Sequence, residues 1–305
     1  MIRLIATVES LEQAEALLPV VDCIYFGEEA FGLRLPHSFT RKEQKELIAM
    51  AHQHKKEVLI AVNGIIHPEK MKQIPEYLTF LKQHQADAIA LGDPGIIHLM
   101  NKHPEYALPF VYDGETMVTS ARQINFWARK GASGAVLARE VPFKEMKNME
   151  ELAIPVEVLI YGATCIHQSK RPLLQNYYRF TQQDEGISKD QGLFLSEPKK
   201  PETHYSIFED QHGTHIFANH DLALTQELLD LANAGFCTWK LDGIYTPEKE
   251  FIEIVKRYDQ ARQQILNHEF SSEEAKRLGE EIRLFHPVER TIDTGFFHLE
   301  PDAIK

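Results

Sequence analysis

The sequence predicts an α/β protein that folds as a closed (β/α)8 barrel of the TIM type, with an insertion after the seventh strand and a helical tail at the C-terminus. Three observations favour this fold. Short β-rich runs alternate with amphipathic helical stretches along most of the chain. The β-rich runs are continuously apolar, as expected of parallel strands that are buried on both faces. Eight such units occur within residues 1–268, which is the usual length of one barrel.

Nearly all of the eight predicted strands are followed by a helix, which is typical of parallel strands joined by right-handed crossovers. The strands cover residues 2–7, 22–27, 57–63, 86–91, 108–112, 134–138, 156–161 and 236–241. An open doubly wound sheet is the alternative. A glycine-rich phosphate loop after the first strand would favour that fold, but residues 7–10 contain no glycine.

Capping signals mark several helix starts. Ser10 precedes Gln13, and Thr40 precedes Glu43, in patterns that cap helix N-termini. Pro68 suits the first turn of a further helix. The predicted helices cover residues 10–20, 40–54, 68–85, 96–102, 120–130, 142–152, 222–233 and 246–266.

The regular alternation stops after the seventh strand. Residues 168–218 are polar and helix-poor, and we predict that they form an insertion in the barrel domain of residues 1–268. Within the insertion, residues 204–208 and 215–218 flank a turn-like stretch and are expected to pair as a hairpin. Residues 269–305 are expected to form a tail with one helix, capped by Ser271 and Glu274, and an extended end.

The charge balance limits the partners of the chain. Among its 305 residues, 33 Lys and Arg stand against 45 Asp and Glu, so the formal net charge is −12. Such a chain does not bind a phosphate backbone through its overall field and would need a local basic patch. Lys199, Lys200, Arg171 and Arg179 give the insertion local positive charge, which could face an anionic partner or be merely solvated.

Three cysteines, Cys23, Cys165 and Cys237, are too few and too scattered for a disulfide framework and favour a reducing compartment. No apolar stretch is long enough to span a bilayer. The N-terminus lacks the long apolar region of a signal peptide. We therefore expect a cytoplasmic protein that does not interact with a membrane.

Functional residues of a (β/α)8 barrel lie where its strands end at the C-terminal face. Polar side chains follow the predicted strand ends at Arg34, Asn63, Asp93, Tyr112, Arg139, Glu140, Tyr161, Cys165, Lys240 and Asp242. They predict a polar pocket at one mouth of the barrel. The alternative is that some of them only cap helices or pair with each other. Arg139 suits a carboxylate or phosphate group, with an interstrand salt bridge as the alternative.

Two further patterns have alternative readings. Cys165 could act as a nucleophile with His167 as its base, although a lone buried thiol is favoured because such a base usually comes from elsewhere in the fold. The spacing His212-x-x-His215 is compatible with metal ligands, but no HExxH helix accompanies it, and surface imidazoles are favoured. We therefore predict no metal site.

Several motifs in a fixed order point to a known family. They are residues 25–27, 31–34, 126–127, 136–140, 157–165, 219–222, 239–243 and 294–297. With these motifs the chain resembles the collagenase-like peptidase family U32 over nearly its whole length. The resemblance adds Glu157 and Asn219 to the candidates. It implies catalytic roles for Arg139, Glu140, Glu157, Cys165, Lys240 and Asp242, and substrate binding by Arg34, Asn63, Asp93, Tyr112, Tyr161 and Asn219.

The family includes proteins named as peptidases and relatives that hydroxylate tRNA wobble uridine with prephenate or hydroxylate a quinone precursor. Those relatives carry an iron–sulfur cluster on four cysteines. Here Cys165 matches the first ligand, but Pro172 and Ala223 stand at the second and fourth positions, and residues 180–200 offer no third. Ile244 also replaces a basic residue of the family. The resemblance therefore implies that no cluster is bound, because one thiolate cannot hold it.

The pattern resembles the short, cluster-less member of a two-protein set found in some Gram-positive bacteria. The resemblance implies a subunit for prephenate-dependent hydroxylation of the tRNA wobble uridine. Its expected partners are a longer cysteine-bearing paralogue, tRNA reached through the complex, and a small carboxylate such as prephenate. A collagenase-like peptidase and a non-catalytic scaffold are the alternative functions.

Overall fold

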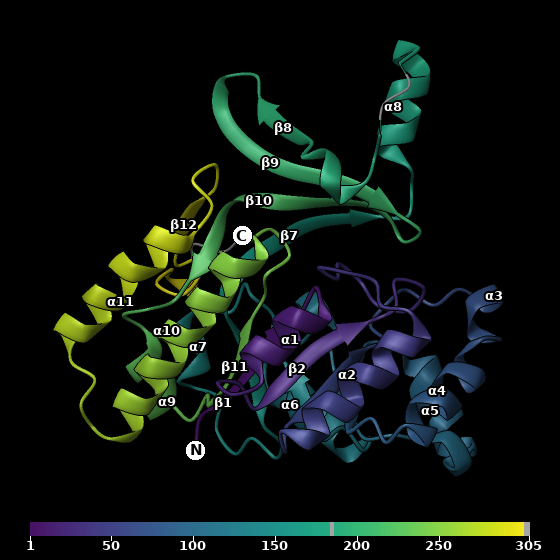
Figure 1. Ribbon diagram of the computed structural model, residues 1–305, viewed down its shortest axis with the longest axis horizontal. Coiled ribbons are helices and arrows are strands. Elements are labelled where there is room, and N and C mark those ends of the chain that lie inside the picture. Colours follow the sequence, from purple (N-terminus) through teal and green to yellow (C-terminus); the bar gives the residue numbers. More distant parts are fainter. Residues whose placement is uncertain (184–185, 302–305) are drawn as a thin grey trace.

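Eight parallel strands close into a barrel in the computed structural model, which describes residues 1–183 and 186–301. The strands are β1 (Arg3–Thr7), β2 (Cys23–Gly27), β3 (Glu57–Ala61), β4 (Ala88–Leu91), β5 (Phe110–Tyr112), β6 (Gly134–Val136), β7 (Val156–Ser169) and β11 (Thr238–Leu241). They pair in sequence order, with β11 beside both β1 and β7. This closure confirms the predicted (β/α)8 fold and excludes the open sheet (Figure 1).

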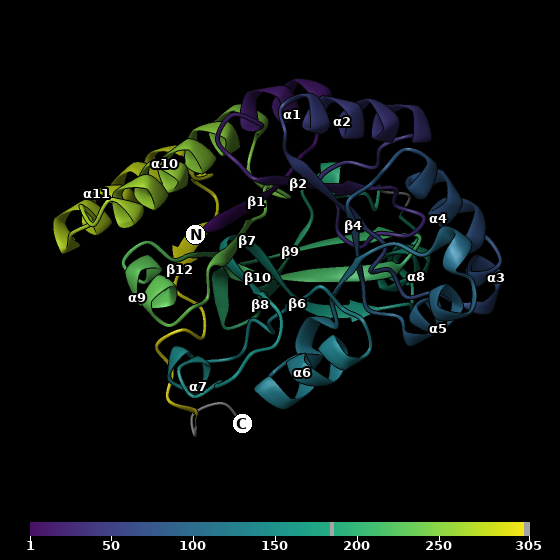
Figure 2. The same cartoon turned by 90° about the horizontal axis from the view of Figure 1, so that it is seen from below.

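Alternate residues of the strands serve two cores. Side chains such as Ile5, Tyr25, Leu59 and Ala90 fill the inside of the barrel. Their neighbours along each strand point outward and pack beneath the ring of helices seen in Figure 2. This alternation decides which polar residues at the strand ends reach the barrel mouth.

The surrounding helices are α1 (Leu11–Leu17), α2 (Arg41–Gln53), α3 (Pro68–Met71), α4 (Ile74–Gln83), α5 (Pro94–Lys102), α6 (Ala121–Arg129), α7 (Phe143–Met146), α9 (Leu228–Asn233) and α10 (Glu248–Leu266). The predicted caps are present: the Ser10 side chain accepts a hydrogen bond from the Gln13 amide, and Thr40 and Glu43 form a capping box. The single helix predicted for residues 68–85 is wrong. The chain breaks after Met71, and the next helix begins at Ile74.

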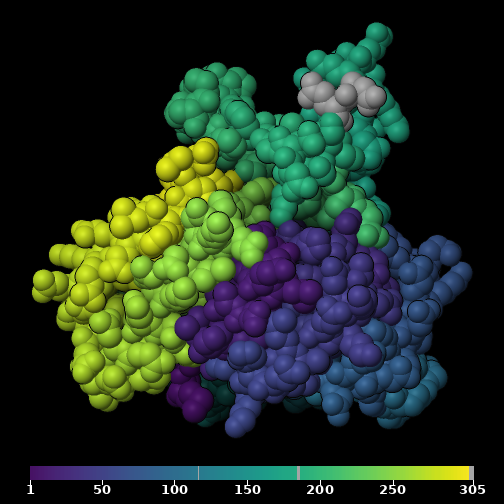
Figure 3. All heavy atoms as spheres, in the orientation of Figure 1, coloured from purple at the N-terminus to yellow at the C-terminus, as the bar shows by residue number. Residues whose placement is uncertain are grey.

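The insertion contains more regular structure than the single predicted hairpin. β7 continues past the barrel mouth and pairs in antiparallel fashion with β10 (Gly213–Ala223), which pairs with β9 (Lys200–Asp210), which in turn pairs with β8 (Phe194–Glu197). The predicted hairpin is confirmed, with Asp210 opposite Gly213. The helix predicted to begin at residue 222 begins later, at Leu228, because β10 extends to Ala223. We call residues 166–218 the arm, which projects above the barrel mouth (Figures 1 and 3).

The expectation that the arm is helix-poor is wrong, since it contains α8 (Leu173–Thr181). Leu174 and Tyr178 of this helix are buried against Ile207 of β9. A helix of this length is marginal by itself and gains its stability from such packing, which is not visible in the local sequence.

The C-terminal residues pack on the barrel and on the base of the arm. α11 (Ser272–Phe285) begins at the predicted Ser271 cap and packs against α10. β12 (Thr291–Asp293) pairs with β10. The division of the chain at residue 268 stays a prediction. Within the described residues, no helix is long and apolar enough to cross a membrane.

Candidate functional site

A polar cavity opens at the C-terminal mouth of the barrel. Eight of the sequence-predicted residues line it: Arg34, Asn63, Arg139, Glu140, Glu157, Cys165, Lys240 and Asp242. The remaining wall is formed by Tyr25, Leu33, Asp113, Glu115, Val136, Leu137 and Leu159. The fold thus brings together residues that lie more than two hundred positions apart in the chain.

Glu157 and Lys240 lie on the neighbouring strands β7 and β11, and both point into the barrel. Lys240 Nζ lies 3.7 Å from Glu157 Oε1 and 3.5 Å from the centre of the Tyr25 ring. Glu157 is 3% exposed, and its Oε2 has no hydrogen-bond partner. Burial raises the pKa of Glu157, with Lys240 acting in the opposite direction. A buried carboxyl group with a free oxygen and a raised pKa is suited to hold or transfer a proton.

Asn63 and Asp113 fix the loop on the opposite side of the cavity. The Asn63 side chain accepts a hydrogen bond from the Leu33 amide at 2.9 Å and donates one to Asp113 Oδ2 at 2.7 Å. The Asp113 charge also contributes to the raised pKa of Glu157. This pair positions the loop that carries Arg34.

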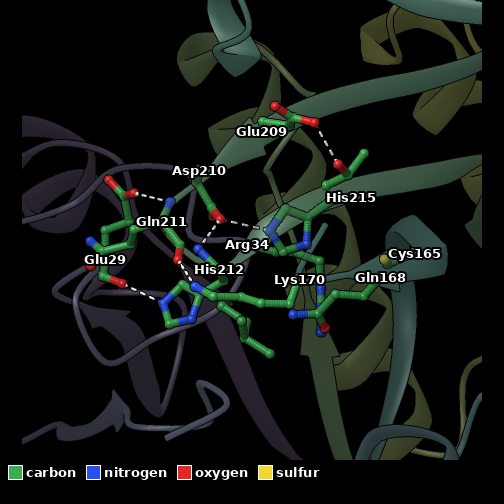
Figure 4. A network of polar contacts seen from close by, with 12 residues as sticks. Glu29, Arg34, Cys165, Gln168, Lys170, Glu209, Asp210, Gln211, His212 and His215 are labelled. Carbon is green, nitrogen blue, oxygen red and sulfur yellow. Dashed lines mark hydrogen bonds and ion pairs between the residues drawn. The ribbon is translucent and has the colours of Figure 1, made fainter. Parts of the chain in front are cut away.

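Arg34 joins the barrel mouth to the arm. Its guanidinium forms an ion pair with Glu115 and donates a hydrogen bond to Gln168 Oε1 at 3.0 Å (Figure 4). Burial disfavours its charge, but Glu115 and the Cys165 side chain outweigh that effect, so the pKa of Arg34 lies above its usual range. Arg34 is therefore a fixed positive charge at the cavity wall.

Arg139 and Glu140 retain unused hydrogen-bonding capacity. Among the described residues, Arg139 forms no ion pair, so the interstrand salt bridge considered from the sequence is not found. Glu140 Oε2 is buried without a partner. Unsatisfied polar groups inside a cavity are costly unless a ligand or water meets them, and a guanidinium fits a carboxylate or phosphate.

Cys165 lies beside an imidazole other than the one predicted. Its Sγ donates to the backbone oxygen of His167 at 3.3 Å, while the ring that acts on the thiol electrostatically is that of His215 on β10. His215 Nε2 lies 2.9 Å from Asp210 Oδ1, and its Nδ1 is buried without a hydrogen-bond partner (Figure 4). Burial raises the pKa of Cys165, but His215, Arg34 and Arg139 outweigh burial, so the pKa is lowered overall.

The pattern His212-x-x-His215 serves the junction of arm and barrel. His212 Nε2 lies 2.6 Å from the Glu29 backbone oxygen, and Lys70 Nζ donates to Gln211 at 2.9 Å. Burial lowers the pKa of His212 to about 4. Each imidazole therefore already has a partner, and no group of His, Cys, Asp and Glu suited to a metal ion occurs in the described ranges.

Tyr112 and Tyr161 do not reach the cavity, for reasons of strand geometry. Val111 packs inside the barrel, so Tyr112 points outward and stacks on Trp127 with 3.6 Å between ring centres. Pairing between β7 and β11 shifts after Leu159, a bulge that turns Tyr161 outward. There the Tyr161 hydroxyl lies 2.8 Å from His286 Nδ1 and 2.9 Å from Thr246 Oγ1.

Asp93 and Asn219 also lie outside the cavity. Asp93 caps α5 by accepting a hydrogen bond from the Gly95 amide at 2.6 Å. Asn219 lies on β10 and accepts a hydrogen bond from the His204 amide, which fixes two strands of the arm to each other. Both side chains hold local structure, which was the alternative considered from the sequence.

Four side chains of this region were given no site role from the sequence: Tyr25, Asp113, Glu115 and His215. Of these, Asp113 was recognised as a polar residue at the end of the fifth strand. Asp113 directly follows Tyr112, and successive side chains of a strand point to opposite faces. The sequence does not show which of the two faces is the inside of the barrel, so it could not choose between Tyr112 and Asp113. His215 was considered from the sequence only as one half of a metal-ligand pattern. No local signal places it beside Cys165, because the two meet only through the pairing of β7 with β10.

The cysteines do not fit an iron–sulfur cluster. Cys165 is at the barrel mouth, whereas Cys23 begins β2 and Cys237 directly precedes β11, so both lie at the N-terminal end of the barrel. Pro172 and Ala223, at two of the remaining ligand positions, offer no donor. A single thiolate does not hold a cluster that takes about four ligands.

Comparison with known proteins identifies the family. The model of peptidase family U32 matches residues 8–305. The chain belongs to peptidase family U32. Among its relatives, tRNA hydroxylation protein P2 of Bacillus subtilis (strain 168) is 35% identical over 90% of this chain and 90% of its own length.

Other relatives are longer. The chain is 23% identical to tRNA hydroxylation protein P1 of the same organism, with 73% of this chain and 53% of that protein covered. It spans 59% of tRNA hydroxylation protein P of Escherichia coli (strain K12), at 24% identity over 73% of this chain. Among solved structures, the U32 peptidase Mk0906 matches 79% of this chain and 92% of its own with a TM-score of 0.51 and 12% identity, which supports the fold alone.

Proposed function

We propose that this chain is a subunit that acts in tRNA hydroxylation, and that the barrel mouth binds a small carboxylate substrate such as prephenate. The similarity to tRNA hydroxylation protein P2 over nine tenths of both chains supports the process. One observation supports the ligand class: Arg139 lines the cavity and has no ion-pair partner among the described residues, so its guanidinium is free to pair with a carboxylate.

In this proposal, different side chains of the cavity bind the substrate, hold a proton and position the loop of Arg34. Arg139, assisted by the fixed charge of Arg34, would bind a substrate carboxylate through its planar guanidinium. Glu157, with its raised pKa and its neighbour Lys240, would hold or move a proton at the substrate. Asn63 and Asp113 would keep the loop of Arg34 in place.

We further propose that the chain carries no cluster and acts beside a longer paralogue. With one thiol at the mouth, it lacks the ligands for redox chemistry of the kind that the family resemblance implies. The existence of both P1 and P2 in one organism supports a pair of unequal length. Its three free cysteines are consistent with a cytoplasmic location.

Deletion of the gene followed by mass spectrometry of tRNA tests the process. We expect loss of hydroxyuridine at the wobble position and its restoration by the wild-type gene. We expect no restoration by Arg139→Gln, whereas Arg129→Gln, a change outside the cavity on α6, should restore it. Unchanged hydroxyuridine after deletion would count decisively against the proposal.

Calorimetry tests the ligand class and separates the subunit from a scaffold. Prephenate should release or take up heat with the wild-type protein and should bind at least tenfold more weakly to Arg139→Gln. A scaffold without a pocket ligand gives no heat with either protein.

A cysteine peptidase is the second candidate, because Cys165, His215 and Asp210 lie in the order of nucleophile, base and orienting carboxylate. Purified protein should be incubated with casein and collagen fragments, beside Cys165→Ala. We expect no hydrolysis. Hydrolysis that survives a chelator and disappears in Cys165→Ala would instead support the peptidase.

A further inference from the structure

Helix α8 presents an apolar face that the rest of the chain does not cover. Leu173, Tyr177 and Phe180 follow each other at spacings of four and three residues, which places them on one side of the helix. They are 38%, 57% and 87% exposed. The opposite side, with Leu174 and Tyr178, is buried against the arm. Two adjacent exposed aromatic rings on a projecting helix indicate a contact surface.

The stretch that contains α8 is positively charged although the whole chain is acidic. Residues 166–183 contain Lys170, Arg171 and Arg179 and no Asp or Glu, and the next acidic residue is Asp184. The formal charge of this stretch is therefore +3 in a chain of −12. Arg171 and Arg179 are exposed and form no ion pair with any residue that the structure describes. Their charges are available to an anionic partner.

The face lies on the arm that grows directly out of the candidate site. β7 carries Cys165 of the cavity and leads within a few residues to α8. The hydrogen bond between Arg34 and Gln168 and the one from Lys189 Nζ to the Pro36 backbone oxygen, at 2.6 Å, tie the arm to the loop that lines the mouth. Figures 1 and 3 show the arm above the barrel. A ligand on α8 would thus be held on the side of the barrel at which the cavity opens.

We propose that this α8 surface, formed by Tyr177, Phe180, Arg171 and Arg179, contacts the single-stranded loop of an RNA. Bases stack on the two aromatic rings, and the two guanidinium groups pair with phosphates. The inference rests on the proposed function and names the surface that receives the RNA. The positive charge of residues 166–183 in a chain of net charge −12 favours an anionic partner, and RNA offers phosphates to the guanidinium groups and bases to the rings.

Direct binding is tested with an unmodified tRNA transcript and fluorescence anisotropy. We expect Tyr177→Ala/Phe180→Ala to weaken binding about tenfold or more. Arg171→Gln/Arg179→Gln should weaken it and reduce the slope of log affinity against log salt by about one to two. The matched controls are Leu284→Ala and Lys276→Gln/Arg283→Gln, which change exposed residues of α11 and should leave binding within twofold. Equal binding of the transcript by all variants would show that the α8 surface does not bind RNA.

Crosslinking in cells decides between RNA and protein. The photoreactive residue p-benzoylphenylalanine is placed at position 177 and, as a control, at position 284. We expect an RNA-containing product that ribonuclease shortens from position 177 and none from position 284. A product from position 177 that contains only protein, such as the paralogue, overturns the RNA assignment, and so does the absence of any product.

Complementation separates this inference from the proposed function. If deletion removes hydroxyuridine and the two α8 double variants restore it fully, the proposed function stands and the α8 surface is wrong. If deletion changes nothing, the proposed function is wrong, and the crosslink still reports whether α8 touches RNA.

Discussion

At the scale of single residues, Glu157 stands out as a carboxyl group that is buried at the barrel mouth and has a raised pKa. The carboxyl group is buried beside Lys240, Tyr25 and Asp113, and one of its oxygens has no partner. Lys240 favours the charged form, whereas burial and Asp113 favour the neutral one. A ligand that changes the surroundings of this carboxyl group would therefore change its pKa.

Glu157→Gln should be more stable relative to the wild type at pH 7 than at pH 5. The pKa of Glu157 is raised in the folded state, so the folded protein binds a proton at this group more tightly than the unfolded chain does. The contribution of Glu157 to the free energy of unfolding should therefore fall as pH rises above about 4.5, by about 1.4 kcal/mol for each unit of difference in pKa. Urea denaturation of both proteins at pH 5 and pH 7 measures this change in their stability difference.

Glu12→Gln is the control, because this side chain is exposed on α1. It should follow the wild type at both pH values. Parallel pH dependence of Glu157→Gln and wild type would contradict the raised pKa.

Cys165 should be the most reactive thiol of the chain. Its pKa is lowered by His215 and two arginines against the effect of burial, whereas burial raises the pKa of Cys23 to about 12. Iodoacetamide at pH 7.5, followed by peptide mass spectrometry, should label Cys165 well before Cys23. His215→Ala should slow the labelling of Cys165 several-fold, and His167→Ala should not. Equal labelling rates of Cys165 in the two variants would show that His215 does not lower the pKa of Cys165.

At the scale of elements, the tail is held to the base of the arm by a buried ion pair. The Arg290 guanidinium donates to both carboxylate oxygens of Asp221 on β10 and to Ser206 on β9. His286 at the end of α11 bonds with Tyr161 of β7. Three elements distant in the sequence thereby meet where β7 turns from the barrel into the arm, close to Gly162. At Gly162 φ is +130°, and a Cβ would lie 2.4 Å from the Asp242 backbone oxygen.

Asp221→Ala should lower the free energy of unfolding by about 3–5 kcal/mol, because it leaves the Arg290 charge buried without its partner. Guanidinium denaturation followed by circular dichroism measures the loss. Glu289→Gln, an exposed neighbour of Arg290 along the chain, should change stability by less than about 0.5 kcal/mol. A loss of similar size in both variants would mean that the ion pair is not the cause.

At the scale of the whole molecule, the arm and the barrel are one unit joined by polar contacts around the turn of the β9–β10 hairpin. His212 contacts the Glu29 backbone oxygen, Lys70 contacts Gln211 and Arg34 contacts Gln168 (Figure 4). Together with the apolar cluster of Phe208 and Phe217 with Ile244, these contacts set the position of the arm on the barrel. One of these contacts is made by the buried side chain of His212. The stability of the junction should therefore depend on pH.

The junction should weaken as pH falls below about 6.5. The pKa of His212 is about 4 in the folded state, so the unfolded chain takes up its proton first and stability is lost on acidification. The titration of His212 should lower the free energy of unfolding by about 2 kcal/mol between pH 6.5 and pH 5. His212→Gln should lose correspondingly less stability over that interval, while His54→Gln, on an exposed helix end, should match the wild type. Denaturation curves at the two pH values give the comparison.

The sequence by itself determined the barrel, because eight continuously apolar runs separated by capped helices can bury their strands only between two layers. It also placed seven candidate residues at one mouth, since parallel strands end on the same side, and the family resemblance added Glu157. Only the tertiary structure decided the rest. The bulge after Leu159 turned Tyr161 outward, and pairing of β7 with β10 brought His215 to Cys165. The packing of Leu174 and Tyr178 on the arm made α8 a helix. Each depends on contacts between residues far apart in the chain, which no local pattern records.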